Sequence, residues 1–455
     1  MIQIGFHGAA KTVTGSNYFI KTDNGNFVVD CGMFQGPDVE GRNLEPYAYN
    51  PAEADFALLT HAHIDHSGML PKLYKGGFRG RIYATNHTIQ ISNLLLMDSA
   101  KIQENNFKLG EPYGKYTNQV ALVYNTYDAE ETTHLFESVH FEDEFEPLPG
   151  IKVKFIRAGH ILGAASIEVT IKDGDGWKKI MFSGDIGRLQ SPLIETFDTE
   201  YKSDPDYVLI ESLYGSEVHP NRNDNVEDMI KVINETIEKG GNVFIPTFSV
   251  QRTQEVLHDL KTAQEEGKLD KDQPVWLDSP LAQKVSYIYL TALTGKDEAL
   301  FTFDSLRFVK KAKQSYGLTK QKGQIILAGS GMADGGRIMH HLQTGLDNPK
   351  NTIIFVGYQA DGTLGRELKD GAKEVMVEKT KVNVKARIVA YEGFSAHGDS
   401  EDYKAWIQRF NTDKLKNTFL IHAEEDRAEA FDKELDKIGI TKSHIPDWKE
   451  EVKLS

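Results

Sequence analysis

The sequence predicts an α/β protein in which a second α/β domain interrupts the first. Strand-like apolar runs alternate with helical patterns through the middle of the chain, which favours a parallel sheet covered by helices. Histidine or aspartate follows such runs at positions 61, 160 and 185, and again at 422. If these residues form one site, the chain between positions 185 and 422 must leave the first domain and return to it.

The segment Leu58–Pro71, LLTHAHIDHSGMLP, carries the strongest signal, and it follows the apolar run Phe56–Leu59 that we expect to be a buried strand. It contains four residues of metal-ligand type, His61, His63, Asp65 and His66. Imidazole and carboxylate groups hold zinc-like ions at neutral pH. Because alternate residues of an extended chain point to opposite sides, we expect the first two to face one ion and the last two its neighbour.

Four residues cannot complete two metal sites, and two further candidates lie downstream. His160 in RAGHILG follows the strand-like run Val153–Ile156. Asp185 in MFSGDIG follows the run Ile180–Phe182. Each stands at a strand end with a glycine nearby, where a backbone can approach an ion closely. The carboxylate of Asp185 could bridge both ions.

Together with Asp30 in VVDCG, this order of residues resembles the metallo-β-lactamase superfamily. The resemblance implies an αββα sandwich, in which two sheets lie face to face with helices outside and the metal site lies at the strand ends. It also implies that Asp30 orients a histidine ligand and does not bind metal itself. The superfamily includes lactamases, thioesterases, lactonases and nucleases, so the fold alone does not define the substrate.

Three motifs of the second half narrow this choice. Glu211 in PDYVLIESLYG, His397 in EGFSAHGD and His422 in TFLIHAE resemble motifs A, B and C of the β-CASP nucleases, which cleave RNA or DNA. That branch includes the endonuclease subunit of the cleavage and polyadenylation specificity factor and short prokaryotic relatives. Four further segments resemble the inserted β-CASP domain, namely Gly241–Leu257, Trp276–Leu281, Ala328–Arg337 and Phe355–Arg366.

The resemblance implies a metal-dependent phosphodiesterase that hydrolyses single-stranded RNA through a bridging hydroxide, with two divalent ions, zinc by preference and manganese as the alternative. The implied ligands are His61, His63 and His160 for the first ion, Asp65, His66 and His422 for the second, and Asp185 as the bridge. His397 is the expected general acid, and Glu211 its positioning partner. Asp65 completes the catalytic set. A histidine at position 422 favours RNA, because DNA-directed members tend to have valine there.

Candidate RNA contacts lie in two glycine-rich segments and one basic run. They are Ser330, Gly331, Arg337, Gly362, Thr363, Arg366, Lys310, Lys311 and Lys313. Small residues expose backbone N–H groups that can hold phosphate, although glycine clusters more often mark turns. The basic run Arg307–Lys322 is equally consistent with a solvated helix surface. The formal net charge of −15 repels a polyanion, so any RNA surface must be local.

These motifs predict a first domain made of residues 1–214 and 393–455, with residues 215–392 as the inserted β-CASP domain. The single Cys31 fits a reducing compartment, and no segment reaches the ~18 apolar residues of a membrane span. We therefore expect a cytoplasmic protein, for which a homodimer is possible.

Three alternatives remain open at this stage. A hydrolase of a small ester or thioester would use the same histidine array, but it does not need the insertion with His397. A DNA-directed β-CASP nuclease would share the whole architecture. A catalytically silent scaffold would have lost metal ligands, whereas this chain retains all those that the resemblance implies.

Overall fold

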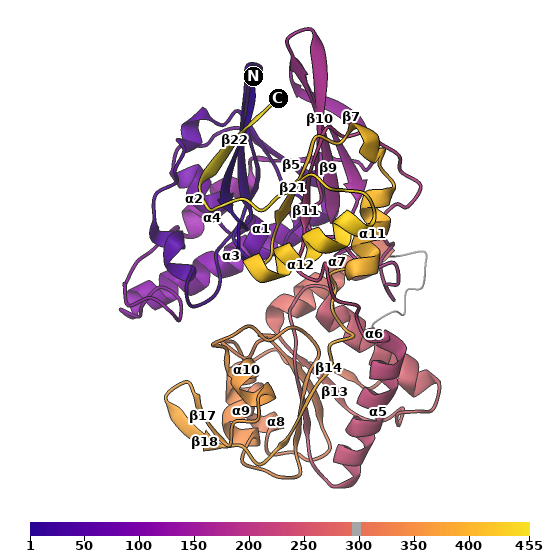
Figure 1. Cartoon of the computed structure of the whole chain (residues 1–455). Helices are drawn as coiled ribbons and strands as arrows, with labels where there is room; N and C mark the ends of the chain where they lie inside the picture. The colour runs from indigo at the N-terminus through magenta and orange to yellow at the C-terminus, as the bar shows by residue number, and fades with distance from the viewer. Residues whose placement is uncertain (294–301) are drawn as a thin grey trace. The chain divides into compact units, whose positions relative to one another are not determined.

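The computed structural model describes residues 1–293 and 302–455 and divides into two compact units (Figure 1). The first unit comprises Met1–Val218 and His397–Ser455, and the second comprises His219–Ala396. The second unit thus spans residues 219–396, whereas the motifs predict an inserted domain of residues 215–392. Among the described helices, none combines the length and the apolar character that crossing a membrane requires.

Two seven-stranded sheets form the centre of the first unit. The first sheet has the order β22 (Glu450–Leu454), β1 (Ile2–Gly8), β2 (Asn17–Thr22), β3 (Gly25–Cys31), β4 (Phe56–Leu58), β5 (Arg81–Thr85) and β6 (Phe136–Val139). The second has the order β21 (Ser443–His444), β20 (Asn417–Ile421), β11 (Tyr207–Glu211), β10 (Gly176–Phe182), β9 (Ala165–Asp173), β8 (Ile151–Arg157) and β7 (Glu144–Leu148).

The two sheets pack face to face through buried aromatic and aliphatic side chains. Phe6 and Phe27 of the first sheet share this core with Phe155 and Phe182 of the second. On the outer face of the first sheet lie α2 (Leu70–Lys75), α3 (Asn86–Lys108) and α4 (Thr126–Thr133), and on that of the second lie α11 (Ser400–Gln408) and α12 (Glu425–Lys437). The predicted αββα sandwich is therefore confirmed.

The C-terminal segment returns to the first unit and completes both sheets. Strand β20 runs parallel to β11, with Ile421 opposite Glu211, and β22 pairs antiparallel with β1. The indigo N-terminal and yellow C-terminal strands accordingly lie side by side in Figure 1. This register brings His422, the residue after β20, to the edge of the sheet where Glu211 ends its own strand.

The second unit contains a six-stranded sheet whose ladders are all parallel, as the alternating pattern predicts. Its order is β14 (Leu306–Phe308), β13 (Val275–Asp278), β15 (Ile325–Ala328), β12 (Val243–Pro246), β16 (Thr352–Phe355) and β19 (Arg387–Ala390). Its helices are α5 (Arg222–Glu238), α6 (Arg252–Glu265), α7 (Pro280–Leu293), α8 (Ala312–Leu318), α9 (Ile338–Gly345) and α10 (Leu364–Lys369).

Two details of the second unit differ from the expectation. A separate antiparallel hairpin, β17 (Glu374–Val377) with β18 (Thr380–Asn383), interrupts the α/β alternation. The basic run Arg307–Lys322 is not one helix surface, because it begins in the edge strand β14 and continues into the short helix α8. Its lysines are nevertheless exposed, as the sequence suggests.

Candidate metal centre

The histidine-rich loop changes from extended to helical conformation in its middle. His61 follows β4, and His63 is the N-cap of the short helix α1 (Ile64–Ser67), which carries Asp65 and His66. The expected division into two pairs is present, but the start of α1 produces it, not strand alternation. Gly32 lets the loop pack closely, because a Cβ there would lie 1.6 Å from the Asp65 carbonyl oxygen.

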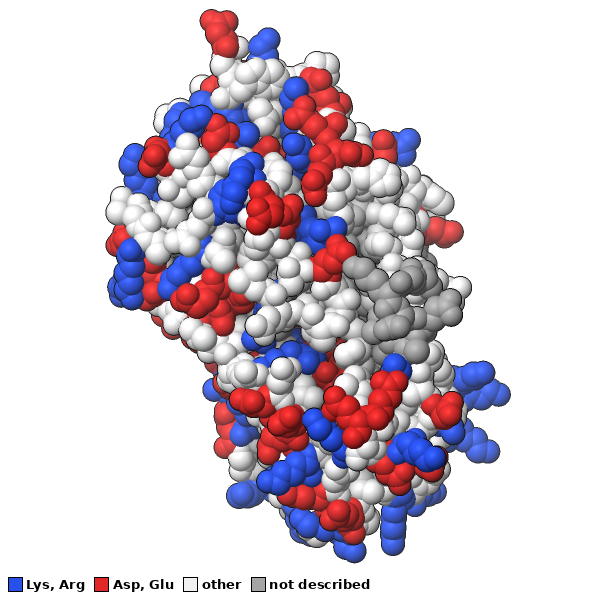
Figure 2. Space-filling model, turned by 90° about the vertical axis from the view of Figure 1, so that its right-hand side faces the viewer, with Lys and Arg blue, Asp and Glu red and all other residues white. Residues whose placement is uncertain are grey.

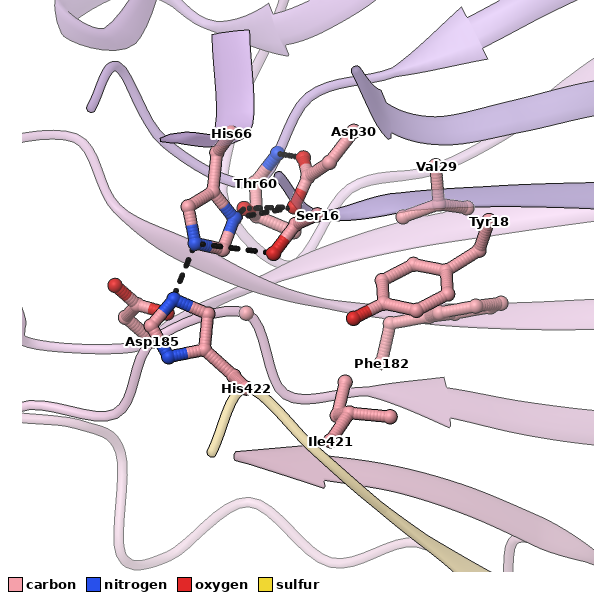
Figure 3. A pocket seen from close by; sticks show the side chains of 11 residues that line it. Ser16, Tyr18, Val29, Asp30, Thr60, His66, Phe182, Asp185, Ile421 and His422 are labelled. Carbon is pink, nitrogen blue, oxygen red and sulfur yellow. Dashed lines mark hydrogen bonds and ion pairs between the residues drawn. The ribbon is translucent and has the colours of Figure 1, made fainter. Parts of the chain in front are cut away.

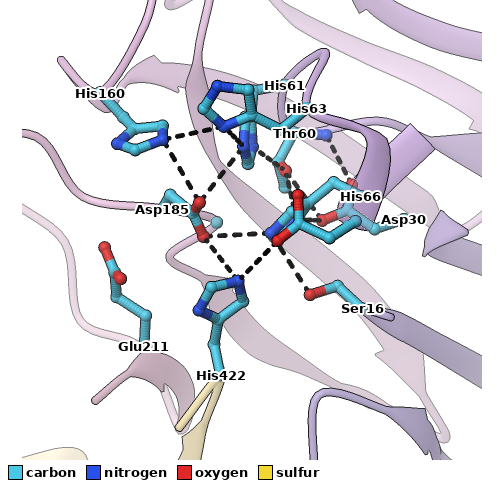
Figure 4. A network of polar contacts seen from close by, with 12 residues as sticks. Ser16, Asp30, Thr60, His61, His63, His66, His160, Asp185, Glu211 and His422 are labelled. Atoms are coloured by element: carbon cyan, nitrogen blue, oxygen red, sulfur yellow. Dashed lines mark hydrogen bonds and ion pairs between the residues drawn. The ribbon is translucent and has the colours of Figure 1, made fainter. Parts of the chain in front are cut away.

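A first ligand group converges on one oxygen of Asp185 (Figure 4). Asp185 Oδ2 lies 3.3 Å from His61 Nε2 and 3.4 Å from His160 Nε2. His63 Nδ1 lies 3.2 Å from His61 Nε2 and 3.1 Å from His160 Nε2. Four potential ligand atoms from three different loops therefore surround one point.

A second group converges on the other oxygen of the same carboxylate. Asp185 Oδ1 lies 3.1 Å from His66 Nε2 and 3.5 Å from His422 Nε2. Asp65 Oδ2 lies 3.5 Å from His422 Nε2. Asp185 thus stands between the two groups and offers one oxygen to each.

These separations fit a metal ion better than direct hydrogen bonding. Nitrogen or oxygen ligands about 2.0–2.1 Å from a tetrahedral zinc ion lie about 3.3 Å from one another, which is the spacing seen in the first group. Of the atoms that face the two groups, both oxygens of Asp185 and Nε2 of His422 are buried without a hydrogen-bond partner. Buried polar atoms rarely stay unsatisfied, so the donor set is one that a cation would complete.

Asp30 contacts the site through His66, as the resemblance implies. Its Oδ2 lies 2.7 Å from His66 Nδ1. Thr60 fixes the carboxylate, because its backbone N–H donates to Oδ1 and its hydroxyl to Oδ2, each at 2.8 Å. A carboxylate on the far nitrogen directs the opposite nitrogen of the ring toward an ion and makes it more basic.

Burial and charge set the protonation of the histidines in opposite ways. Burial lowers the pKa of His61 and His160, and it lowers the pKa of His63 to about 3, so these imidazoles are neutral and able to bind a cation. Burial also acts against charge on His66 and His422. The neighbouring carboxylates together outweigh it and raise the pKa of both rings, Asp185 with Asp30 for His66 and Asp185 with Asp65 for His422. The more basic nitrogens are the stronger donors.

A small cavity lies behind the second ligand group (Figure 3). It encloses about 10 Å³, room for about one water molecule. Ser16, Asp30 and His66 line one side, whereas Tyr18 and other side chains of the inter-sheet core line the opposite side. The apolar wall lowers the local dielectric constant and so strengthens the electrostatic interactions of the site.

His397 and Glu211 form a pair next to these groups. His397 Nδ1 lies 2.9 Å from Glu211 Oε2, and the backbone N–H of Ile186 donates to the other oxygen of Glu211. Burial opposes charge on His397, but Glu211 and Asp185 outweigh it and raise its pKa to about 9. Its side chain is 21% exposed, whereas Glu211 is fully buried, so His397 is the member of the pair that solvent can reach.

The candidate RNA contacts lie in the second unit. Some of their side chains already form hydrogen bonds or ion pairs within the protein. Arg337 donates to the buried Asp278, and Arg366 pairs with Asp361 and Asp370. Thr363 is the N-cap of α10 and is buried. The remaining candidates are Ser330, Gly331 and Gly362 in the two loops, and the exposed Lys310, Lys311 and Lys313.

Two contributors were not identified from the sequence. Thr60 holds Asp30 in place, and the only available signal was a hydroxyl residue directly before the first histidine. Asp278 anchors Arg337 and also accepts from Ser315 and His341. The sequence WLDSPL places Asp278 at the end of a strand. It does not indicate the partners of Asp278, because Ser315 and His341 lie 37 and 63 residues further along the chain.

Comparison with known families agrees with both the fold and the site. Residues 11–197 match the metallo-β-lactamase superfamily, and residues 253–368 match the β-CASP domain. Residues 381–446 match the Zn-dependent metallo-hydrolase RNA specificity domain. The matches therefore assign the chain to the metallo-β-lactamase superfamily, and the His/Asp cluster is a candidate metal site of the kind that this superfamily uses.

Individual relatives identify the branch. Ribonuclease TTHA0252 of Thermus thermophilus is 33% identical over 94% of this chain and 94% of its own length. An RNase J-like protein of Methanocaldococcus jannaschii is 33% identical over 95% of this chain and 94% of its own. The chain belongs to the β-CASP ribonucleases of the metallo-β-lactamase superfamily. A solved protein of unknown function from Enterococcus faecalis V583 shares the fold, with a TM-score of 0.56, 13% identity and 99% coverage of both chains.

The Asp30→Asn variant should bind metal about 10- to 100-fold more weakly, because the amide no longer orients and polarises His66 as a carboxylate does. Competition with a chromophoric chelator measures this change. Asp259→Asn is the matched control, since Asp259 is equally buried but pairs with Arg222 in the second unit. Equal metal affinities for the two variants would show that Asp30 has no role in metal binding.

Proposed function

We propose that the protein hydrolyses phosphodiester bonds of single-stranded RNA at a centre of two divalent ions, zinc by preference and manganese as the alternative. One observation carries this proposal. The two oxygens of the buried Asp185 each face a separate group of ligand atoms, at 3.1–3.5 Å. A bridging carboxylate between two ligand groups is the arrangement of a two-metal hydrolase.

In this proposal one set of ligands comes from each group. His61, His63 and His160 hold the first ion, Asp65, His66 and His422 the second, and Asp185 bridges both. Two bound ions would supply a nucleophilic water at neutral pH and neutralise the charge that develops on the phosphate. The protein holds these side chains in place before substrate arrives, because α1 and the ends of four strands fix them.

His397 protonates the leaving oxygen in this mechanism. Its Nδ1 is directed at Glu211, so its Nε2 is the nitrogen that donates to the departing 3′-oxygen. Glu211 is a positioning residue, since it is fully buried and acts through His397. His397 Nδ1 lies 3.9 Å from Asp185 Oδ2, and the ring groups with Asp185 and Glu211 and not with either of the two ligand groups.

Three features support RNA as the substrate. The match to an RNA specificity domain spans His397 and His422, and two relatives are named ribonucleases. The inserted second unit is an addition that a hydrolase of small esters does not require.

Lys and Arg are interspersed with Asp and Glu on the face drawn in Figure 2, so RNA binding depends on local groups and not on overall charge. The single, buried Cys31 is consistent with action in the cytoplasm.

Protein purified without chelator, or reconstituted with zinc, should contain two ions per chain, because seven ligands with one bridge are available. His422→Ala should lower this value to about one, since the second group loses a ligand while the first stays intact. Mass spectrometry of metals measures both values. His444→Ala, on the neighbouring strand β21, is the control and should retain two ions. A limit of one ion in the unmodified protein, even with excess zinc or manganese, would exclude the binuclear centre.

His397→Ala should lower the rate of RNA cleavage by ~10²- to 10⁴-fold and leave the metal content unchanged, because a general acid is lost and no ligand is. A substrate with a 3′-bridging sulfur tests the role directly. A thiolate leaves without a proton, so this substrate should largely restore the rate of His397→Ala but not that of His422→Ala. Loss of metal from His397→Ala, or no gain with sulfur, contradicts the assignment.

Replacing Lys310, Lys311 and Lys313 together by alanine should weaken RNA binding and reduce its dependence on salt. Each lost phosphate contact removes about 0.7 from the slope of log affinity against log salt for a single strand. Fluorescence anisotropy at several salt concentrations measures this slope. The control replaces three exposed lysines of the first unit, Lys101, Lys108 and Lys172. Identical slopes for the two triple variants would assign the basic run to ordinary solvated surface.

A further inference from the structure

Phe248 is an exposed aromatic residue at the carboxyl edge of the parallel sheet in the second unit. It follows β12 by two residues, and 38% of its surface is exposed. Strand β12 lies between β15 and β16, and both of its ladders are parallel. Ligands of open parallel sheets bind beyond the carboxyl ends of the strands, which is where Phe248 stands.

The neighbouring strands provide a closely fitting socket for this ring. A Cβ on Gly331, in the loop after β15, would lie 2.7 Å from Phe248 Cδ2. A Cβ on Gly357, in the loop after β16, would lie 3.6 Å from Cε2 of the same ring. The two glycines therefore lie along one edge of the ring. A side chain at Gly331 would clash with the ring, whereas a Cβ at Gly357 would make an ordinary van der Waals contact.

A buried glutamine joins the two walls of the socket. Gln359 Nε2 donates to the carbonyl oxygens of Gly331 at 3.1 Å and of Gly357 at 3.0 Å. Gln359 is only 2% exposed, so these bonds are protected from water. The separation between the two glycine loops is thereby fixed.

The backbone of Phe248 is fixed as well. Its carbonyl oxygen accepts from the backbone N–H and the hydroxyl of Thr253, in the first turn of α6. The turn between them contains Gln251 in the left-handed region, at φ +64°. The side chain of Gln251 is held by Glu255 and Tyr289, which stabilises a conformation that non-glycine residues rarely adopt.

We propose that Phe248 is a rigid stacking platform for one nucleobase of the RNA substrate, an inference that rests on the proposed function. A single exposed phenylalanine needs no special explanation, but one immobilised in a socket loses little conformational entropy on binding. The π-face of a base fits an aromatic ring, and such stacking tolerates any base. The adjoining loop supplies Ser330 and Gly331, which are candidate phosphate contacts, so one nucleotide could be held by both its base and its phosphate.

The test combines protein variants with single abasic nucleotides. Affinity for a labelled 12-nucleotide single-stranded RNA is measured by fluorescence anisotropy, in the His397→Ala background to slow cleavage. Phe248→Leu keeps apolar bulk without a π-face, and Phe248→Trp restores one. Trp177→Leu removes an aromatic residue of similar exposure, 48%, from β10 in the first unit and is the matched control.

Phe248→Leu should weaken binding on the order of tenfold at every salt concentration, with an unchanged salt slope because no phosphate contact is lost. Phe248→Trp and Trp177→Leu should bind as the background protein does. An abasic nucleotide at one position should cost the background protein on the order of tenfold and cost Phe248→Leu nothing further.

Two results would overturn the platform. One is an affinity of Phe248→Leu within twofold of the background, and the other is an abasic penalty that persists at full size in Phe248→Leu. Thermal unfolding checks that Phe248→Leu remains folded, and Phe248→Trp gives the same comparison with a ring in place. A different result would contradict the proposed function itself: the wild-type protein would bind RNA but not cleave it.

Discussion

The carboxylate of Asp185 is the group on which the rest of the site depends. It is buried, and each of its oxygens faces two imidazole nitrogens within 3.5 Å. Burying a carboxylate is costly unless positive charge lies beside it, and the surrounding imidazoles, or an ion that they bind, can supply that charge. The loop after β10 can place it there because Gly187 packs against the loop of His160, where a Cβ would lie 1.8 Å from the Gly159 carbonyl oxygen. Asp185 and His160 are therefore held at a fixed separation.

The packing of the two sheets also determines where the candidate metal ligands lie. The loop after β4 comes from the first sheet, whereas His160, Asp185 and His422 come from the second. Both groups of ligands draw on both sheets, so the inter-sheet core around Phe155 and Phe182 sets the distance between them. This dependence explains why the C-terminal segment must return after the insertion. Strand β20 delivers His422, and β22 closes the first sheet beside β1.

In the second unit, as in the first, the candidate functional side chains lie in loops at the ends of strands. Its parallel strands end in loops that carry Phe248, Ser330 and Tyr358. Buried polar side chains hold these loops in place through hydrogen bonds. Gln359 fixes the loops after β15 and β16, and Asp278 holds Arg337 at the end of β13. The loops at the carboxyl edge of the sheet are thus held in place before a ligand binds. This arrangement suits the proposed single-stranded substrate, because a flexible strand loses entropy on binding and a fixed protein surface adds little to that cost.

The sequence by itself determined the superfamily and the β-CASP branch, and it predicted the insertion and the candidate metal ligands, because these depend on residue types at short spacings and strand ends. The HAHIDH array, Asp185 and motifs A to C were sufficient for this. Tertiary structure decided which oxygen of Asp185 faces which histidines, that Thr60 fixes Asp30, and that Gly331 and Gly357 enclose Phe248. It also showed that α1, and not strand alternation, separates the two ligand pairs. These features join residues tens to hundreds of positions apart, and only packing specifies such contacts.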